Sequence, residues 1–218
     1  MNTKILLSLS VIAAVAAIAI GGTVAYFSDT ETSTGNTFSA GTLNLQVGDS
    51  DPTSVKITLS NIKPGDKSNA ATWLVKNTGS ISGKLTVGVG AITNNENNCI
   101  EPEGDNTCGT GADQGELGAN LKVAFWMDVD KSGGWTSGDY YLKSDGNKVS
   151  WANGETTLPS AAYDILNNYG GKTWTDVQTN ITGEAGNFRV EYDLPGDTGN
   201  IIQSDSAVFD ITFTLNQQ

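Results

Sequence analysis

Apolar residues alternate with polar ones along much of this chain, and this period of two constrains the fold more than any other feature. In residues 43–47, every second position is leucine or valine. Because successive side chains of a β-strand point to opposite faces, each such segment is predicted to have one buried and one solvated face. That pattern is typical of antiparallel sheets. The same alternation recurs at residues 55–59, 85–89, 121–127, 188–194 and 209–215.

Turn-forming residues separate these segments. Proline, glycine and aspartate cluster at residues 48–52, 63–66 and 194–197, and residues 77–79 read Asn-Thr-Gly. Proline presets one turn angle, and glycine adopts the positive one. Many short strands with frequent turns predict an all-β sandwich or barrel. For this length we expect a jelly-roll-like antiparallel β-sandwich with long surface loops.

One segment has the pattern of a short helix. Ser160 is a good N-cap for residues 161–169, and Gly170 and Gly171 follow as stop signals. We therefore predict one helix in this all-β chain.

The first 25 residues are organised like a cleavable secretory signal. Lys4 precedes an apolar run over residues 5–20, small residues follow, and the chain then becomes polar. This order predicts cleavage by a signal peptidase between Ala25 and Tyr26, and a mature chain that is secreted, extracellular or on the cell surface. The alternative is a retained anchor or pilin-type helix, but the run is shorter than the roughly 20 residues that a spanning helix needs. We expect a mature form that does not span the membrane.

The chain is strongly acidic. It has 24 Asp and Glu against 12 Lys and Arg, a formal net charge of −12. Such a surface repels nucleic acid and anionic membranes, so neither is an expected partner. The same balance suits cation binding.

Two cysteines, Cys99 and Cys108, lie in a long polar stretch over residues 94–118. In an exported protein, a close pair predicts one local disulfide, which would pin this stretch as a surface excursion. A zinc site is a weak alternative because it needs four ligands, and the chain has no histidine and no further cysteine.

The best candidate metal site is an acidic loop over residues 128–139. It approximates the twelve-residue calcium loop, with acids at the first, third and twelfth positions, a hydroxyl at the fifth and glycine at the sixth. Hard oxygen ligands suit Ca²⁺, with millimolar affinity expected outside the cell. The alternative is an acidic hairpin loop without a cation, because the fifth and twelfth residues depart from the motif. The predicted ligands are Asp128, Asp130, Ser132, Gly134 and Asp139.

The absence of histidine excludes the common catalytic mechanisms of peptidases. Zinc peptidases use His-Glu-x-x-His, and serine and cysteine peptidases use a histidine base. Paired carboxylates remain open for glycoside hydrolysis, although with 24 acids no pair is informative without geometry. We predict no catalytic residues and no enzymatic activity.

Two further features concern the surface. The five tryptophans favour core or lid packing over carbohydrate stacking, because large aromatics dominate interiors and interfaces. Asn180 belongs to the sole Asn-x-Ser/Thr sequon and is a candidate glycosylation site.

Four short strings resemble a known family. Residues 23–33 read TVAYFSDTETS, residues 36–43 read NTFSAGTL, residues 59–66 read LSNIKPGD and residues 75–80 read VKNTGS. In this order and spacing they resemble the TasA/camelysin family of exported proteins, which a SipW-type signal peptidase processes. The likeness covers about residues 20–90 most strongly, and residues 94–190 carry no matching motif.

The resemblance implies a jelly-roll fold and a subunit of a pilus-like biofilm-matrix fibre, a head-to-tail homopolymer. In such fibres the segment after the cleavage site leaves its own subunit and completes a sheet of the next one. This places a donor segment at residues 26–40, ahead of a sandwich domain at residues 41–218. The camelysin branch is named as a surface metallopeptidase, a competing implication. The implied donor residues include Tyr26, Phe27, Thr30, Thr32 and Thr34.

The residue types of the donor segment agree with this use. Threonine and aromatic residues are good strand formers. Thr30, Thr32 and Thr34 fall on one face of an extended segment, opposite Phe27. A frayed terminus is the alternative. A sandwich that lacks one strand leaves an open edge, which accepts a strand from another chain.

Three functions fit the sequence. We expect a fibre-forming matrix protein. The alternatives are a monomeric surface adhesin or calcium-stabilised binding module, and a camelysin-like metallopeptidase.

Overall fold

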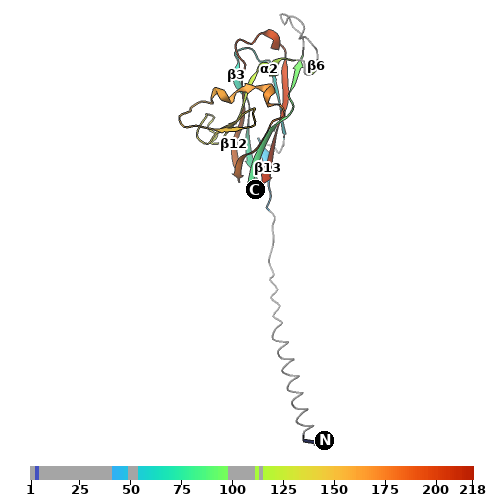
Figure 1. The fold of residues 1–218 in the computed structure, drawn as a ribbon, viewed down its shortest axis with the longest axis vertical. Coiled ribbons are helices and arrows are strands. Elements are labelled where there is room, and N and C mark those ends of the chain that lie inside the picture. The colour runs from blue at the N-terminus through green and yellow to red at the C-terminus, as the bar shows by residue number, and fades with distance from the viewer. Residues whose placement is uncertain (1–2, 5–40, 49–53, 98–110, 113–114) are drawn as a thin grey trace. The chain divides into compact units, whose positions relative to one another are not determined.

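The predicted alternation becomes two antiparallel β-sheets that form a sandwich (Figure 1). The computed structural model describes residues 3–4, 41–48, 54–97, 111–112 and 115–218. The chain divides into two units, Met1–Ala40 and Gly41–Gln218, and both sheets belong to the second. The antiparallel sandwich expected from the sequence is therefore confirmed.

Several predicted features lie outside the described residues. They are the cleavage site between Ala25 and Tyr26, the donor segment at residues 26–40, and the cysteine pair Cys99 and Cys108. These remain predictions.

In the described part of the chain, the first sheet has seven strands. Six of them lie in the order β1 (Leu45–Val47), β3 (Lys67–Asn77), β12 (Glu184–Asp193), β7 (Lys122–Asp128), β8 (Tyr140–Leu142) and β9 (Lys148–Ser150). The seventh, β10 (Asp164–Ile165), also pairs with β7.

The second sheet has six strands among the residues that the structure describes. Five lie in the order β11 (Thr173–Ile181), β4 (Gly83–Val89), β13 (Ser206–Gln217), β5 (Thr93–Glu96) and β6 (Gly111–Ala112). The sixth, β2 (Ser54–Ser60), pairs with β13.

The main core lies between the inward faces of the two sheets. In β4 the residues at 85, 87 and 89 are buried, and those between them are half-buried. Phe188 of β12 and Phe213 of β13 meet edge to face, with ring centroids 5.1 Å apart. Such aromatic pairs stabilise beyond the area they bury, so this contact helps to hold the two sheets together.

Strand β7 departs from the predicted alternation because both of its faces are covered. Val123, Phe125 and Met127 belong to the main core. Ala124 and Trp126, on the opposite face, pack with Trp135, Tyr141 and Ala162 in a second buried cluster. The β7–β8 loop, β8 itself and the segment after it supply these covering residues, so a solvated face was the wrong expectation here.

The predicted continuous helix over residues 161–169 is also wrong. Two 3-10 helices, η1 (Ser160–Ala162) and η2 (Leu166–Tyr169), flank the extended β10. The β10 backbone pairs with β7, matching Asp164 to Val123. Pairing with a sheet edge has overridden the local helical pattern.

The stretch predicted as a surface excursion contributes to the sandwich at both ends. Strands β5 and β6 pair antiparallel. A short helix, α2 (Leu117–Asn120), follows, and the Leu117 side chain is buried in the main core. A last 3-10 helix, η3 (Asn200–Ile202), precedes β13.

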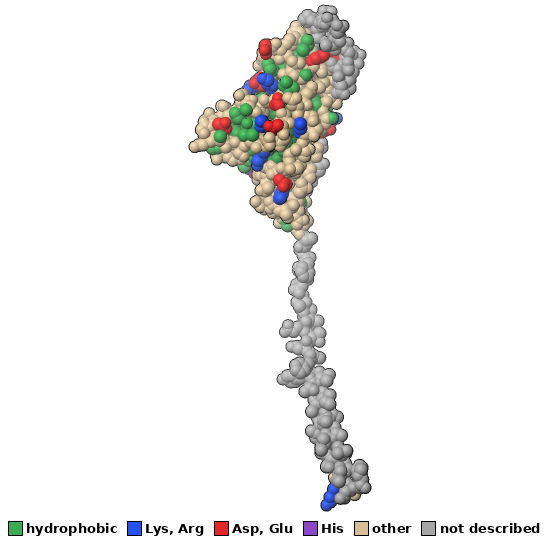
Figure 2. Space-filling view, viewed as in Figure 1, with side chains coloured by type: hydrophobic (Ala, Val, Ile, Leu, Met, Phe, Trp, Pro, Cys, Tyr) green, Lys and Arg blue, Asp and Glu red, His purple; other side chains and the backbone are tan. Residues whose placement is uncertain are grey.

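Within the described residues, no helix is both long and apolar enough to cross a membrane. On the face drawn in Figure 2, basic and acidic side chains lie near one another instead of forming one basic patch. Lys67 and Asp193, for example, form an exposed ion pair at 3.2 Å.

Candidate cation site in the loop between Asp128 and Asp139

The acidic loop joins two paired strands of the first sheet. Strand β7 ends at Asp128, β8 begins at Tyr140, and Met127 pairs with Tyr140. The start of the loop lies close to β12. A Cβ on Gly186, which has a φ of +137°, would lie 2.7 Å from the Asp128 carbonyl oxygen. Only glycine permits this approach without strain.

Three of the predicted ligands come together. Asp128, Asp130 and Asp139 each offer a carboxylate oxygen, and these oxygens all lie within 4.8 Å of one another. Asp128 and Asp139 are fully buried, and Asp130 is exposed. Calcium holds its oxygens at about 2.3–2.6 Å, so ligands of one ion lie up to about 5 Å apart. The spacing fits one Ca²⁺ ion.

Hydrogen bonds from the loop backbone position these acids. Asp139 accepts from the Val129 amide at 2.8 Å through Oδ1 and from the Thr136 amide at 2.7 Å through Oδ2. Asp128 Oδ2 accepts from the Gly133 amide at 3.0 Å. The acids therefore organise the loop as well as facing one another.

One oxygen of the cluster is left over. Asp128 Oδ1 is buried and has no hydrogen-bond partner in the described part of the chain. Burying an unpaired carboxylate oxygen is costly unless it is protonated or binds a cation. This oxygen fits a cation ligand.

The pKa values of two of these acids move in opposite directions. Burial raises the pKa of Asp128 above its ordinary value of 3.8, although the Gly133 amide partly offsets it. The Ser132 backbone amide lowers the pKa of the Asp130 carboxyl, so Asp130 stays ionised. The buried acid is the one whose charge a cation would most stabilise.

The other two predicted ligands lie outside the acid cluster. Ser132 and Gly134 are exposed in the same loop. Ser132 Oγ donates to the Gly134 carbonyl oxygen at 3.4 Å. They shape the loop, and the carboxylates form the cluster.

Comparison with known families identifies the chain. The sequence model of the camelysin metallo-endopeptidase family matches residues 2–218. The chain belongs to the camelysin family. No curated protein matches it. The family resemblance predicted from the four strings is confirmed, and the match also spans the region that carries none of them.

The camelysin family is described as a metallo-endopeptidase family, and the metal that this description implies can be tested against the ligands of this chain. There is no histidine, so a His-Glu-x-x-His zinc centre cannot be built. The loop supplies only oxygens, which suit Ca²⁺ better than catalytic zinc. The residues fit a hard structural cation, and we derive no peptidase step through a metal.

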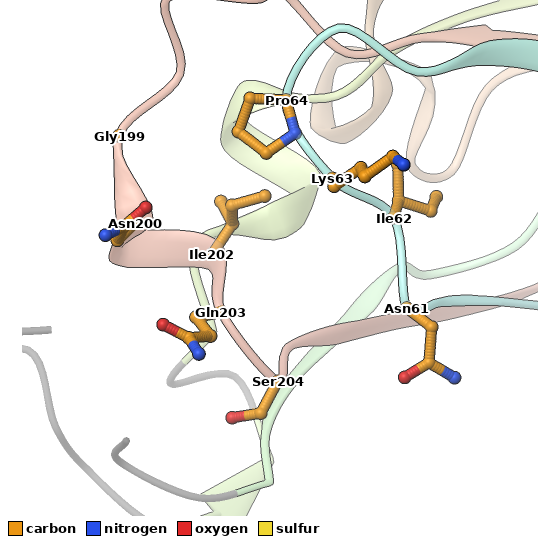
Figure 3. Close-up of a pocket in the computed structure, with 9 residues that line it drawn as sticks. All are labelled: Asn61, Ile62, Lys63, Pro64, Gly199, Asn200, Ile202, Gln203 and Ser204. Atoms are coloured by element: carbon orange, nitrogen blue, oxygen red, sulfur yellow. The ribbon is translucent and has the colours of Figure 1, made fainter. Parts of the chain in front are cut away.

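A separate pocket of this camelysin-family chain lies between residues 61–64, which follow β2, and the segment around η3. Figure 3 shows its lining side chains, which are mainly amide and apolar. Lys63 is the one ionisable side chain among the described lining residues. This pocket therefore lacks an acid–base pair.

The remaining predicted features are placed as follows. Trp126 and Trp135 are buried, and their indole nitrogens donate to Glu191 and Glu155 at 3.0 and 2.7 Å. These two tryptophans therefore pack in the second buried cluster, in agreement with the predicted core or lid packing. Asn180 is exposed in β11 with a φ of +59°.

Sequence reasoning missed a second acid cluster, formed by Glu96, Glu116 and Asp205. These residues share no spacing motif, because they come from three distant segments. Only the fold brings them together.

Proposed function

We propose that this camelysin-family protein is an exported structural subunit that assembles into extracellular filaments. Residues 26–34 of one copy add as a strand to a sheet of the next copy. The observation that supports this proposal is a half-covered edge of β13.

Strand β2 covers only the first part of that edge. It pairs with β13 from Ser206 to Thr212. On the opposite side, β4 follows β13 to Gln217. Residues 213–217 therefore have no strand partner on the β2 side among the described residues. Unpaired backbone of this kind is a template for an added strand.

An apolar groove accompanies the open backbone. It is lined by Leu43 and Leu45, at the start of the first sheet, and by residues 212–215 of β13. Leu43, Leu45 and Leu215 are only half-buried. A donor strand with an aromatic residue such as Phe27 would cover these side chains while pairing with β13.

Hydrogen bonds fix the Leu43 side of the groove. The Ser80 amide donates to the Thr42 carbonyl oxygen at 2.8 Å, and the Thr78 amide donates to Asn44 at 2.8 Å. One of the family-like strings, residues 75–80, therefore holds the segment before β1 that carries Leu43. The groove is preformed, which lowers the ordering cost of binding.

The energetics suit reversible, concentration-dependent assembly. Burying about three large side chains per junction contributes roughly 5–9 kcal/mol before costs. Ordering the donor and losing rigid-body freedom offset much of this gain. A head-to-tail contact that does not close into a ring generates a filament.

A charge placed in the groove tests the proposal. We expect Leu43→Glu to raise the protein concentration needed for filaments at least about tenfold, because a lost leucine contact is worth roughly 1.5–3 kcal/mol. Ile201→Glu is the matched control, since Ile201 is an exposed hydrophobic residue outside the groove. Sedimentation and negative-stain microscopy give the readout, with circular dichroism to verify the fold.

Filaments of Leu43→Glu at the wild-type concentration would contradict this acceptor edge. A wild-type protein that stays monomeric at every concentration would instead favour the adhesin or binding-module function.

We also propose that the Asp128–Asp139 loop binds Ca²⁺ as a structural ion. The unpaired Asp128 oxygen and the three converging carboxylates support this. The ion would brace the loop that carries Trp135 into the lid cluster. We expect no peptidase activity, and a casein assay with a chelator control is the check.

A further inference from the structure

We propose a second Ca²⁺ site, formed by Glu96, Glu116 and Asp205. It is independent of filament assembly and of the loop at Asp128. It would join three segments of the sandwich that are distant in sequence.

The three acids converge from different elements. Glu96 ends β5, Glu116 precedes α2, and Asp205 precedes β13. One carboxylate oxygen from each lies within 4.8 Å of the others. Glu96 is 4% exposed, Asp205 is 2% exposed, and Glu116 is half-buried. Three carboxyl groups are thus gathered in a largely buried place.

Only one oxygen of the Asp205 carboxylate accepts hydrogen bonds from the described residues. Its Oδ2 accepts from the amides of Glu116 at 2.6 Å and Leu117 at 2.9 Å. Its Oδ1 is buried and has no hydrogen-bond partner in the described ranges. This unpartnered oxygen, beside two other carboxyl groups, is the second observation that points to a bound cation.

The backbone is closely fitted around this carboxylate. A Cβ on Gly115 would lie 3.1 Å from Asp205 Cγ and 2.9 Å from the Asn95 carbonyl carbon. The backbone from Gly115 to Leu117 therefore packs closely against the Asp205 carboxylate. A preformed cradle of this kind orients oxygens before an ion arrives.

The chemistry favours Ca²⁺. Burial raises the pKa of Asp205 above its ordinary value, and the charge of Glu116 adds to this effect. Ca²⁺ takes six to eight oxygens in flexible geometry, so three carboxylates with water complete a shell. Mg²⁺ demands a tighter octahedron and keeps most of its own water.

A cation at this site would cross-link separate elements of the sandwich. Glu96 of β5 pairs with Gly111 of β6, and Glu116 directly precedes α2. A cation bound to Glu96, Glu116 and Asp205 would tie the end of β5 and the start of α2 to the start of β13. The local opening of this region should therefore become rarer when Ca²⁺ is present.

Hydrogen exchange measured by mass spectrometry tests this in purified protein. The parent carries Asp128→Asn and Asp130→Asn, which disable the loop cluster. In CaCl₂ at ten times the dissociation constant, exchange of peptides covering residues 115–120 and 202–208 should slow about tenfold. Glu96→Gln should abolish the slowing. Glu184→Gln, an exposed acid in β12 outside this cluster, should keep it.

Glu116→Gln is a second test variant in case Glu96→Gln does not fold. No slowing in the parent, or slowing that persists in both glutamine variants, overturns the site. Slowing by MgCl₂ with none by CaCl₂ overturns the assignment of calcium.

Discussion

Asp128 and Asp139 stand at opposite ends of the β7–β8 loop, yet both are fully buried, with carboxylate oxygens no more than 4.8 Å apart. Asp139 is satisfied by backbone amides, whereas Asp128 keeps one unpartnered oxygen. Two buried carboxylates this close repel each other. The Arg189 guanidinium, at 3.4 Å, contacts the Asp128 oxygen that already accepts from Gly133, so the other oxygen remains without a partner. The stability of the loop should therefore depend on calcium.

Asp128→Asn should separate the effects of calcium and charge. In chelator at pH 7, two effects of the substitution oppose each other, because it removes a buried charge and also breaks the ion pair of Asp128 with Arg189 at 3.4 Å. In CaCl₂ at ten times the dissociation constant, it should lose about 1.4 kcal/mol of the calcium-induced gain. For a domain of this size, scanning calorimetry should show that CaCl₂ raises the melting temperature of Asp128→Asn by about 3–6 °C less than that of the wild type.

Asp145→Asn is the matched control for that experiment. Asp145 is an exposed acid in the turn after β8, paired with Lys143 at 2.9 Å. It should keep the full calcium increment. Equal increments in wild type and Asp128→Asn would remove calcium from the loop.

The pH dependence in chelator should reveal the raised pKa of Asp128. Because its folded pKa lies above the ordinary 3.8, the folded state retains a proton that the unfolded state has released. The free energy of unfolding of the wild type relative to Asp128→Asn should therefore fall as pH rises from about 3.8 through the raised pKa.

At Asp145 the pH dependence of the free energy of unfolding should have the opposite sign. The Lys143 side chain lowers the pKa of Asp145. The wild type relative to Asp145→Asn should therefore gain stability as pH rises from that lowered pKa to about 3.8. Denaturant titrations across this range of pH give both differences in the free energy of unfolding. If the difference between wild type and Asp128→Asn stays flat or rises with pH, the pKa of Asp128 is not raised by burial.

The sequence predicted the two-sheet architecture because a period of two is a local property of each strand. Leu85, Val87 and Val89 are buried as their spacing implies. It did not predict the second buried face of β7, because that face exists only once Trp135 folds over Trp126. The helix expected after Ser160 failed for a similar reason, since the edge of β7 offered its backbone a better partner.

The two acid clusters differ in the same way. Asp128, Asp130 and Asp139 were predictable because a loop motif places them close together in sequence. Glu96, Glu116 and Asp205 were not, because only the register of β5 and β13 brings their segments together. Spacing reveals sites within one loop and misses sites assembled from several elements.

Gly79→Ala should destabilise the wall of the proposed acceptor groove. A Cβ at this position would lie 2.1 Å from the Thr42 carbonyl oxygen and 2.7 Å from Leu43 Cα. The backbone must shift to relieve this, at a cost of roughly 1–3 kcal/mol. Gly183→Ala is the control, because a Cβ there meets nothing within 4 Å. Denaturant unfolding compares them, and equal stability of the two variants would show that the close approach carries no constraint.

The central claim is that each copy lends residues 26–34 to the open edge of β13 in the next copy. The most direct measurement is negative-stain electron microscopy of concentrated mature protein with and without these residues. We predict filaments from the intact chain and only folded monomers from the deletion. Filaments that persist after the deletion would contradict the account.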